Sequence, residues 1–82
     1  MPIKSYLAIA KDGSKRDLQQ VISKLPGCEV TPAENKNVLV IITETRSAAE
    51  DEQLLKKLKS LDQLQMLTLV SAFSNQSELT SG

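Results

Sequence analysis

The stretch LPGCEV, residues 25–30, decides how the first half of this chain folds, because it joins an apolar helix pattern to a short strand. Proline disfavours the helical conformation in the residue before it, and glycine accepts the positive φ of a tight turn. We therefore expect a helix to end where this stretch begins, a turn at its proline and glycine, and a strand over residues 28–31. Pro32 cannot donate a ladder hydrogen bond, so this strand is expected at a sheet edge.

Two elements are predicted before this stretch. Residues 3–10, IKSYLAIA, alternate two sets of side chains and are typical of a strand. Ser14, followed three residues later by Asp17, predicts a helix start of the capping-box type. The helix that follows has one apolar stripe at helical spacing, which consists of Leu18, Val21, Ile22 and Leu25.

Three elements are predicted after it. Residues 38–43, VLVIIT, are apolar in both alternating sets, which is typical of a strand in the centre of a sheet. Ser47 with Glu50 is a second capping-box match. Residues 66–73, MLTLVSAF, predict a last strand. The second helix has its own apolar stripe, formed by Leu54, Leu55, Leu58 and Leu61.

The element order is β-α-β-β-α-β, the pattern of ferredoxin-like domains. We predict an α+β fold in which a four-stranded antiparallel sheet, with its first and third strands central, carries two helices on one face. Residues 1–73 are expected to form a single domain. Residues 74–82 are polar, and we expect a disordered tail there.

The composition narrows the range of functions and cellular compartments that this chain could have. Ten Lys and Arg balance ten Asp and Glu, so no global basic field favours nucleic acid as a partner. A single cysteine cannot form an internal disulfide, which fits a reducing compartment. The apolar run near the N-terminus is too short for a membrane span and is followed by Asp12 and Gly13, unlike a signal peptide. We predict a soluble, cytoplasmic protein.

Candidate catalytic groups are few. Histidine is absent, so an ordinary catalytic triad cannot be assembled. Cys28 could act as a nucleophile or metal ligand, but a lone thiol at a strand start is more often a small buried hydrophobe. The acidic run at residues 50–52 could bind a metal or act as an acid/base pair, but its place at a helix N-terminus is explained by the helix dipole. We predict no enzymatic activity, no metal site and no cofactor.

The informative feature is an excess of apolar side chains on the strands. Only one set of each strand can face the helices, so the other set should form an open apolar face. A small monomer that exposes such a patch usually binds a partner there, for example the apolar side of a helical peptide. The alternative is a homodimer that pairs two open faces. The expected open face contains Ser5, Leu7, Ile9, Leu39, Ile41, Thr43, Thr68, Val70 and Ala72, and the expected core set contains Tyr6, Ala8, Ala10, Val38, Val40, Ile42, Leu67, Leu69, Ser71 and Phe73.

The chain resembles the NapD family, whose members are small cytoplasmic chaperones for the catalytic subunit of periplasmic nitrate reductase. The resemblance covers about residues 3–75, and it includes VLVIIT and an aromatic near the end of the last strand. Its most specific element is LPGCEV in its place after the first helix.

This resemblance implies a ferredoxin-like protein that binds the twin-arginine signal peptide of the nitrate reductase precursor. It would hold the peptide as a helix and delay export until the molybdenum cofactor is inserted. The protein itself would be a monomer or a weak dimer. A small-molecule-binding regulatory domain of the ferredoxin-like kind remains an alternative. Carboxylates near the open face would receive the two arginines, and the unranked candidates are Asp12, Glu29, Glu34 and Glu44.

Overall fold

The computed structural model describes residues 3–34 and 37–73, the last of these for its backbone alone. The predicted tail, residues 74–82, lies outside the described residues. Within them, no helix is both long enough and apolar enough to cross a bilayer. The elements are β1 (Ile3–Ala10), α1 (Lys15–Ser23), β2 (Cys28–Pro32), β3 (Val38–Glu44), α2 (Ala48–Lys59) and β4 (Leu64–Phe73).

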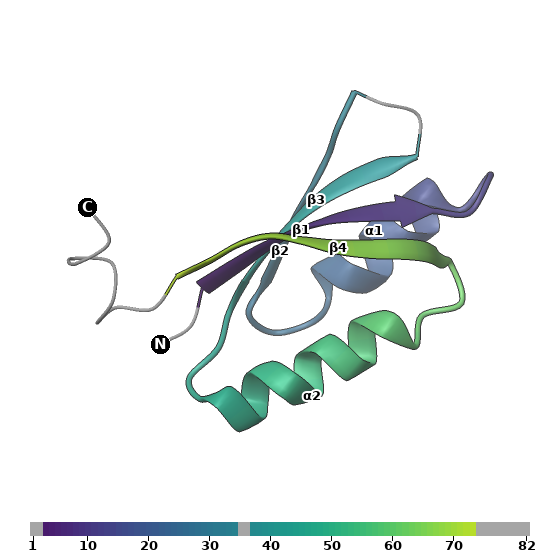
Figure 1. Ribbon diagram of the computed structural model, residues 1–82. Coiled ribbons are helices and arrows are strands. Elements are labelled where there is room, and N and C mark those ends of the chain that lie inside the picture. The colour runs from purple at the N-terminus through teal and green to yellow at the C-terminus, as the bar shows by residue number, and fades with distance from the viewer. Residues whose placement is uncertain (1–2, 35–36, 74–82) are drawn as a thin grey trace.

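The sheet has the predicted topology. Its strand order is β2-β3-β1-β4, and all neighbouring pairs are antiparallel. The strands β1 and β3 are central, and β2, which ends at Pro32, lies at an edge. Both helices lie on the same side of this sheet (Figure 1). The α+β ferredoxin-like fold class is therefore confirmed.

The turn after α1 shows why the LPGCEV stretch needs its glycine. Gly27 has a φ of 81°, a left-handed conformation that side chains disfavour. Its carbonyl oxygen accepts a hydrogen bond from the Glu44 N–H at 2.8 Å. A Cβ at this position would lie 2.6 Å from the Glu44 carbonyl oxygen. The turn thus holds the start of β2 against the end of β3 at close range.

The two predicted helix starts differ in the structure. The Ser47 hydroxyl accepts a hydrogen bond from the Glu50 N–H at 3.2 Å, as a capping box requires. The Glu50 side chain reaches back to the Arg46 N–H at 2.9 Å, one residue earlier than in the standard box. Ser14 occupies the N-cap position of α1, but its side chain makes no capping hydrogen bond, so that part of the prediction is wrong.

The core lies between the sheet and the helices. It is a cluster of side chains that are at most 4% exposed, and further apolar residues pack around it, Cys28 among them. β1 contributes the small Ala8 and Ala10 to this cluster, and β3 contributes the larger Leu39 and Ile41. The buried members are Tyr6, Ala8, Ala10, Leu18, Ile22, Leu39, Ile41 and Leu58.

The predicted facing of β3 is wrong. Leu39 and Ile41 are fully buried under the helices and Thr43 is 1% exposed, whereas all three were expected on the open face. The register with β1 sets this arrangement, because Leu39 pairs with Ala8 and Ile41 with Tyr6, which are core residues. Because both sets of β3 are apolar, alternation alone could not distinguish its two faces.

The predicted facing of β4 is wrong in part. Its pairing with β1 shifts between Ser5 and Tyr6, because Ser5 pairs with Ser71 and Tyr6 pairs with Leu69. Val70 is the additional residue, as in a β-bulge, so the alternation reverses at this point. Ser71 therefore shares the register row of Ser5 on the open side, and Ala72 shares the row of the helix-facing Lys4. Ser71 was expected in the core set and Ala72 on the open face.

Candidate functional site

The side of the sheet opposite the helices is the candidate binding surface, and we call it the open sheet face. It follows from the register, because residues paired across antiparallel strands point to the same side. Its members are Ile3, Ser5, Leu7 and Ile9 on β1, Val38, Val40, Ile42 and Glu44 on β3, Met66, Thr68 and Ser71 on β4, and Glu29 and Thr31 on β2.

Large apolar side chains are exposed on this face. Leu7 at its centre is 39% exposed, Ile42 is 43% exposed and Met66 is 53% exposed. No described helix or strand lies over them (Figure 1). Exposed apolar side chains that are contiguous on a small protein usually mark an interaction site. The face therefore offers a ready contact surface for an apolar ligand.

One polar pair within this face, Ser5 on β1 and Ser71 on β4, is joined by a hydrogen bond. The hydroxyl groups of Ser5 and Ser71 lie 2.6 Å apart in a hydrogen bond between neighbouring strands. Each hydroxyl is thereby satisfied without a ligand. An apolar ligand could cover this pair at little cost, since a buried hydroxyl is unfavourable mainly when it lacks a partner.

The structure brings together four of the nine predicted site residues on this face, namely Ser5, Leu7, Ile9 and Thr68. Five others lie elsewhere: Leu39, Ile41 and Thr43 on the helix side, Val70 at the bulge and Ala72 in the row of Lys4. Whether any of these nine residues contacts a peptide stays a prediction.

The sequence prediction left out five apolar residues of the face: Ile3, Val38, Val40, Ile42 and Met66. One signal could have placed the three on β3. The first strand offers the small Ala8 and Ala10 to the helices, so the larger set of its neighbour fits better beside them. That set is Leu39 and Ile41, which leaves the valines and Ile42 for the other side.

A cleft of about 1100 Å³ opens at one end of the sheet. One wall is the LPG turn with Cys28 and Glu29, and another is Glu44 at the end of β3 with the two residues that follow it, Thr45 and Arg46. Residues of α2, including Leu54 and Lys57, close the helix side. Ile3 and Ile42 line the cleft and also belong to the open sheet face, so the two surfaces are continuous.

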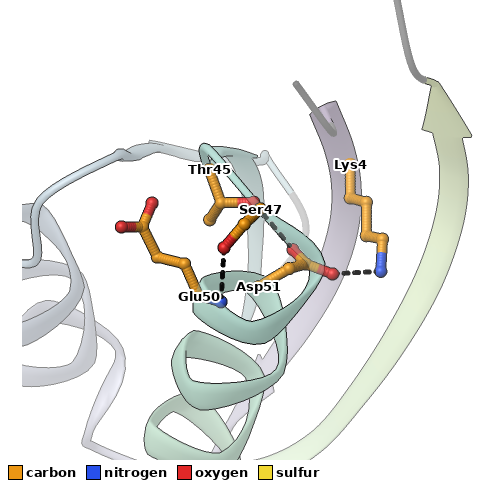
Figure 2. Close-up of polar contacts among 5 residues, drawn as sticks. All are labelled: Lys4, Thr45, Ser47, Glu50 and Asp51. Carbon is orange, nitrogen blue, oxygen red and sulfur yellow. Dashed lines mark hydrogen bonds and ion pairs between the residues drawn. The ribbon is translucent and has the colours of Figure 1, made fainter.

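A polar cluster on the helix side ties α2 to the sheet (Figure 2). The Lys4 ammonium group donates to one carboxylate oxygen of Asp51. The Thr45 hydroxyl donates to the other oxygen at 3.4 Å. The hydrogen bond with Asp51 raises the pKa of Lys4 above its ordinary value of 10.5. Asp51 is only 6% exposed, and its charge is paired with that of Lys4. The helix dipole alone therefore does not explain why an acidic residue stands at this position of α2.

Cys28 has the environment of a packing residue. It is partly buried against the core, and this burial raises the pKa of its thiol above the ordinary value of 9.0. Since the thiolate is the reactive form, a thiol that stays protonated at neutral pH is a poor nucleophile. Within residues 3–34 and 37–73, no group of three or more His, Cys, Asp or Glu side chains could hold a metal ion.

Comparison with known proteins shows a likeness in fold. No protein-family model and no curated protein sequence matches this chain. Among solved structures, the chain is similar to the solution structure of the E. coli Tat proofreading chaperone protein NapD, with a TM-score of 0.77 and 19% sequence identity. The match covers 90% of this chain and 79% of NapD. At this identity the likeness shows the fold, and the resemblance that the sequence indicated is confirmed at that level.

Proposed function

We propose that this protein is a cytoplasmic chaperone of the NapD kind. It binds the twin-arginine signal peptide of the precursor of the periplasmic nitrate reductase catalytic subunit and delays export until the molybdenum cofactor has been inserted. The observation that carries the proposal is the open sheet face, where Leu7, Ile42 and Met66 expose apolar surface that the helices leave uncovered. The shared fold with NapD and the resemblance of the LPGCEV stretch support it.

The binding mode is an amphipathic helix laid on the sheet. A helical peptide satisfies its own backbone hydrogen bonds, so it needs only an apolar surface of matching width to bury one side. Leu7 and Val40 are register partners at the centre of the face and provide such a surface. Removing their exposed area from water supplies the main favourable free energy of binding.

We propose no catalytic activity and no cofactor for this protein. Two groups of polar side chains that the structure brings together are bonded to each other: Lys4 and Thr45 with Asp51, and Ser5 with Ser71. The function is therefore assigned to binding.

A peptide titration tests the proposal. Isotope-labelled protein is titrated with a synthetic twin-arginine leader, and the amide resonances of Leu7, Val40 and Ile42 are expected to shift most. Shifts confined to α1 and α2 would contradict the proposed surface.

A matched pair of variants tests the contact itself. Leu7→Gln removes apolar surface without adding charge and should weaken binding about tenfold, since the exposed part of a leucine contributes on the order of 1 kcal/mol. Leu69→Gln is the control, because Leu69 is 52% exposed but pairs with Tyr6 on the opposite side of the sheet. Equal loss in both variants would contradict binding on the open sheet face.

Self-association is the competing use of the same surface. The molecular mass in solution is measured by sedimentation over a wide concentration range, with and without the leader peptide. A monomer or weak dimer that becomes a one-to-one complex is the expected result. A stable dimer that persists when the peptide is added would favour the homodimeric or small-molecule-binding alternative.

A further inference from the structure

The charge on the open sheet face is distributed unevenly from end to end. Its apolar positions continue along β1 and β3, and at one end the face carries Glu29 and Glu44. These glutamates are the charged residues of the face among residues 3–34 and 37–73, and both side chains are exposed. Neither carboxylate has a hydrogen-bond or ion-pair partner in the described part of the chain.

The other acidic candidates lie at the far end of the sheet and differ in their surroundings. Asp12 accepts a hydrogen bond from the Asn37 side chain at 2.9 Å. Glu34 follows β2 near Lys15, whose ammonium group donates to the carbonyl of Ala33 at 2.8 Å. Positive and negative charges are thus mixed at that end, and the two glutamates form the acidic end.

The cleft extends this acidic end beyond the edge of the face. Glu29 and Glu44 line it together with Ile3 and Ile42, so its sheet side combines carboxylates with apolar surface. Away from the sheet, the cleft is lined by Arg46 in the segment that leads into α2, and by Glu50 and Lys57 on α2. The sheet side carries two carboxylates, whereas on the helix side two cations outnumber the Glu50 carboxylate, so a cationic side chain in the cleft is attracted to the sheet side.

We infer that the open sheet face fixes the direction of a bound peptide helix. The arginine-bearing N-terminal end lies over Glu29 and Glu44 at the cleft, and the apolar part runs along β3 toward Val38 and Ile9. This inference rests on the proposed function, and it ranks the acidic residues that the sequence left unranked. The positive end of the peptide's own helix dipole also lies beside the two carboxylates in this direction.

The dimensions fit this arrangement. Glu44 and Val38 stand at the two ends of β3. Six residues of strand at about 3.3 Å each make roughly 20 Å, which a helix with a rise of 1.5 Å covers in about 13 residues. A ligand with an arginine pair followed by about a dozen apolar helical residues would span the face once.

Charge variants test the direction through affinity. The probe is a synthetic helix-forming peptide with an Arg-Arg pair followed by about a dozen leucine and alanine residues, and a second peptide has Gln-Gln in place of Arg-Arg. The double variant Glu29→Gln with Glu44→Gln should bind the arginine peptide about tenfold more weakly, as two exposed charge pairs allow. It should bind the Gln-Gln peptide as the unmodified protein does. Glu34→Gln, at the mixed end, is the control and should leave both affinities unchanged.

Spin labels test the direction through geometry. A nitroxide at the arginine end of the peptide should broaden the amide signals of Ile42 and Glu44, and a nitroxide at the apolar end should broaden those of Ile9 and Val38. The reverse pattern would overturn the inference, and so would equal weakening by Glu34→Gln.

These outcomes separate the inference from the proposed function. If the arginine peptide binds and shifts the amides of the open sheet face, but the double variant binds it normally, then only the direction is wrong. If the unmodified protein does not bind the arginine peptide, or binds it away from this face, then the proposed function and the inference fail together.

Discussion

The two faces of this sheet consist of neighbouring residues with the same chemistry and opposite environments. Ile41 is fully buried beneath the helices, and Ile42, the next residue on β3, is 43% exposed on the other side. The side chains are identical, so the difference comes entirely from what packs against them. An apolar strand residue of this protein therefore belongs to the core or to the candidate binding surface according to its register and not its type.

Side chains on the helix-covered face have specific packing and ion-pair partners within the protein, whereas those on the open sheet face have few. On the covered side, Ile41 belongs to one buried cluster with Leu18, Ile22 and Leu58 from the two helices. The Lys4 to Asp51 ion pair fixes the start of α2 to the same side. On the open side, Ser5 and Ser71 join neighbouring strands through a side-chain hydrogen bond. One face holds the fold together, and the other remains available to a ligand.

The largest effect is expected from a charge placed on each face in turn. Ile41→Glu buries a carboxylate without a partner and should cost more than about 4 kcal/mol of unfolding free energy. That approaches the whole stability of a domain of this size, so the variant should be unfolded. Ile42→Glu leaves its charge hydrated and should change stability by less than about 1 kcal/mol. Circular dichroism and urea unfolding of both variants check this, and similar curves for the two would contradict the face assignment.

The next effect concerns the turn that sets the register of β2. Gly27→Ala should cost about 2–3 kcal/mol, because a left-handed conformation is strained for alanine and its Cβ would meet the Glu44 carbonyl oxygen. Gly13→Ala is the matched control, because it has the same φ of 81° but nothing within 4 Å of its Cβ position. It should cost about 1 kcal/mol. Urea unfolding measures both, and equal losses would show that the close approach of β2 and β3 adds nothing.

A smaller effect is expected from the ion pair on the covered face. Lys4→Met should lower the unfolding free energy by about 1 kcal/mol or less, since solvent reaches the ammonium group and screens the pair. The sign of the pH dependence follows from the raised pKa of Lys4. Folding stabilises the charged form, so this contribution is fully present below pH 10.5 and is lost as the pH rises through the higher folded pKa.

The measurement is therefore a comparison of Lys4→Met with the unmodified protein at several pH values. The stability difference should be constant near neutral pH and shrink in strongly alkaline solution. A difference that grows with rising pH would show that Lys4 is not stabilised by Asp51 in the folded protein.

The smallest effect is expected at Thr43, whose buried hydroxyl has no hydrogen-bond partner among residues 3–34 and 37–73. Thr43→Val removes an unsatisfied polar group and keeps the shape, so stability should be unchanged or rise by up to about 1 kcal/mol. Thr45→Val is the control, because it removes the hydrogen bond to Asp51 and should destabilise by about 1 kcal/mol. Thermal unfolding of the pair checks this, and equal destabilisation would show that Thr43 has a partner after all.

Much of the fold could be predicted from local signals in the sequence. The LPG turn follows the end of α1, and Ser47 with Glu50 caps α2. Pro32 lacks the N–H that a central strand needs, and it lies in the edge strand β2. The site could be predicted only in part. The predicted facing of β1 was confirmed by the register, since Leu7 and Ile9 lie on the open sheet face and Tyr6 and Ala8 lie on the helix side. The ion pair of Lys4 with Asp51, which are 47 residues apart, left no local signal.

Local signals in the sequence were enough to predict the order of elements, the antiparallel ferredoxin-like topology and an apolar sheet face that the helices do not cover. These follow from periodicity and turn chemistry, which act within a few residues. The side of β3 that faces the helices is set by its pairing with β1, because both of its alternating sets are apolar, and the small Ala8 and Ala10 were the one hint of it in the sequence. Only the tertiary structure decided that β4 reverses its facing at Val70, because a bulge is a property of two paired strands and not of one.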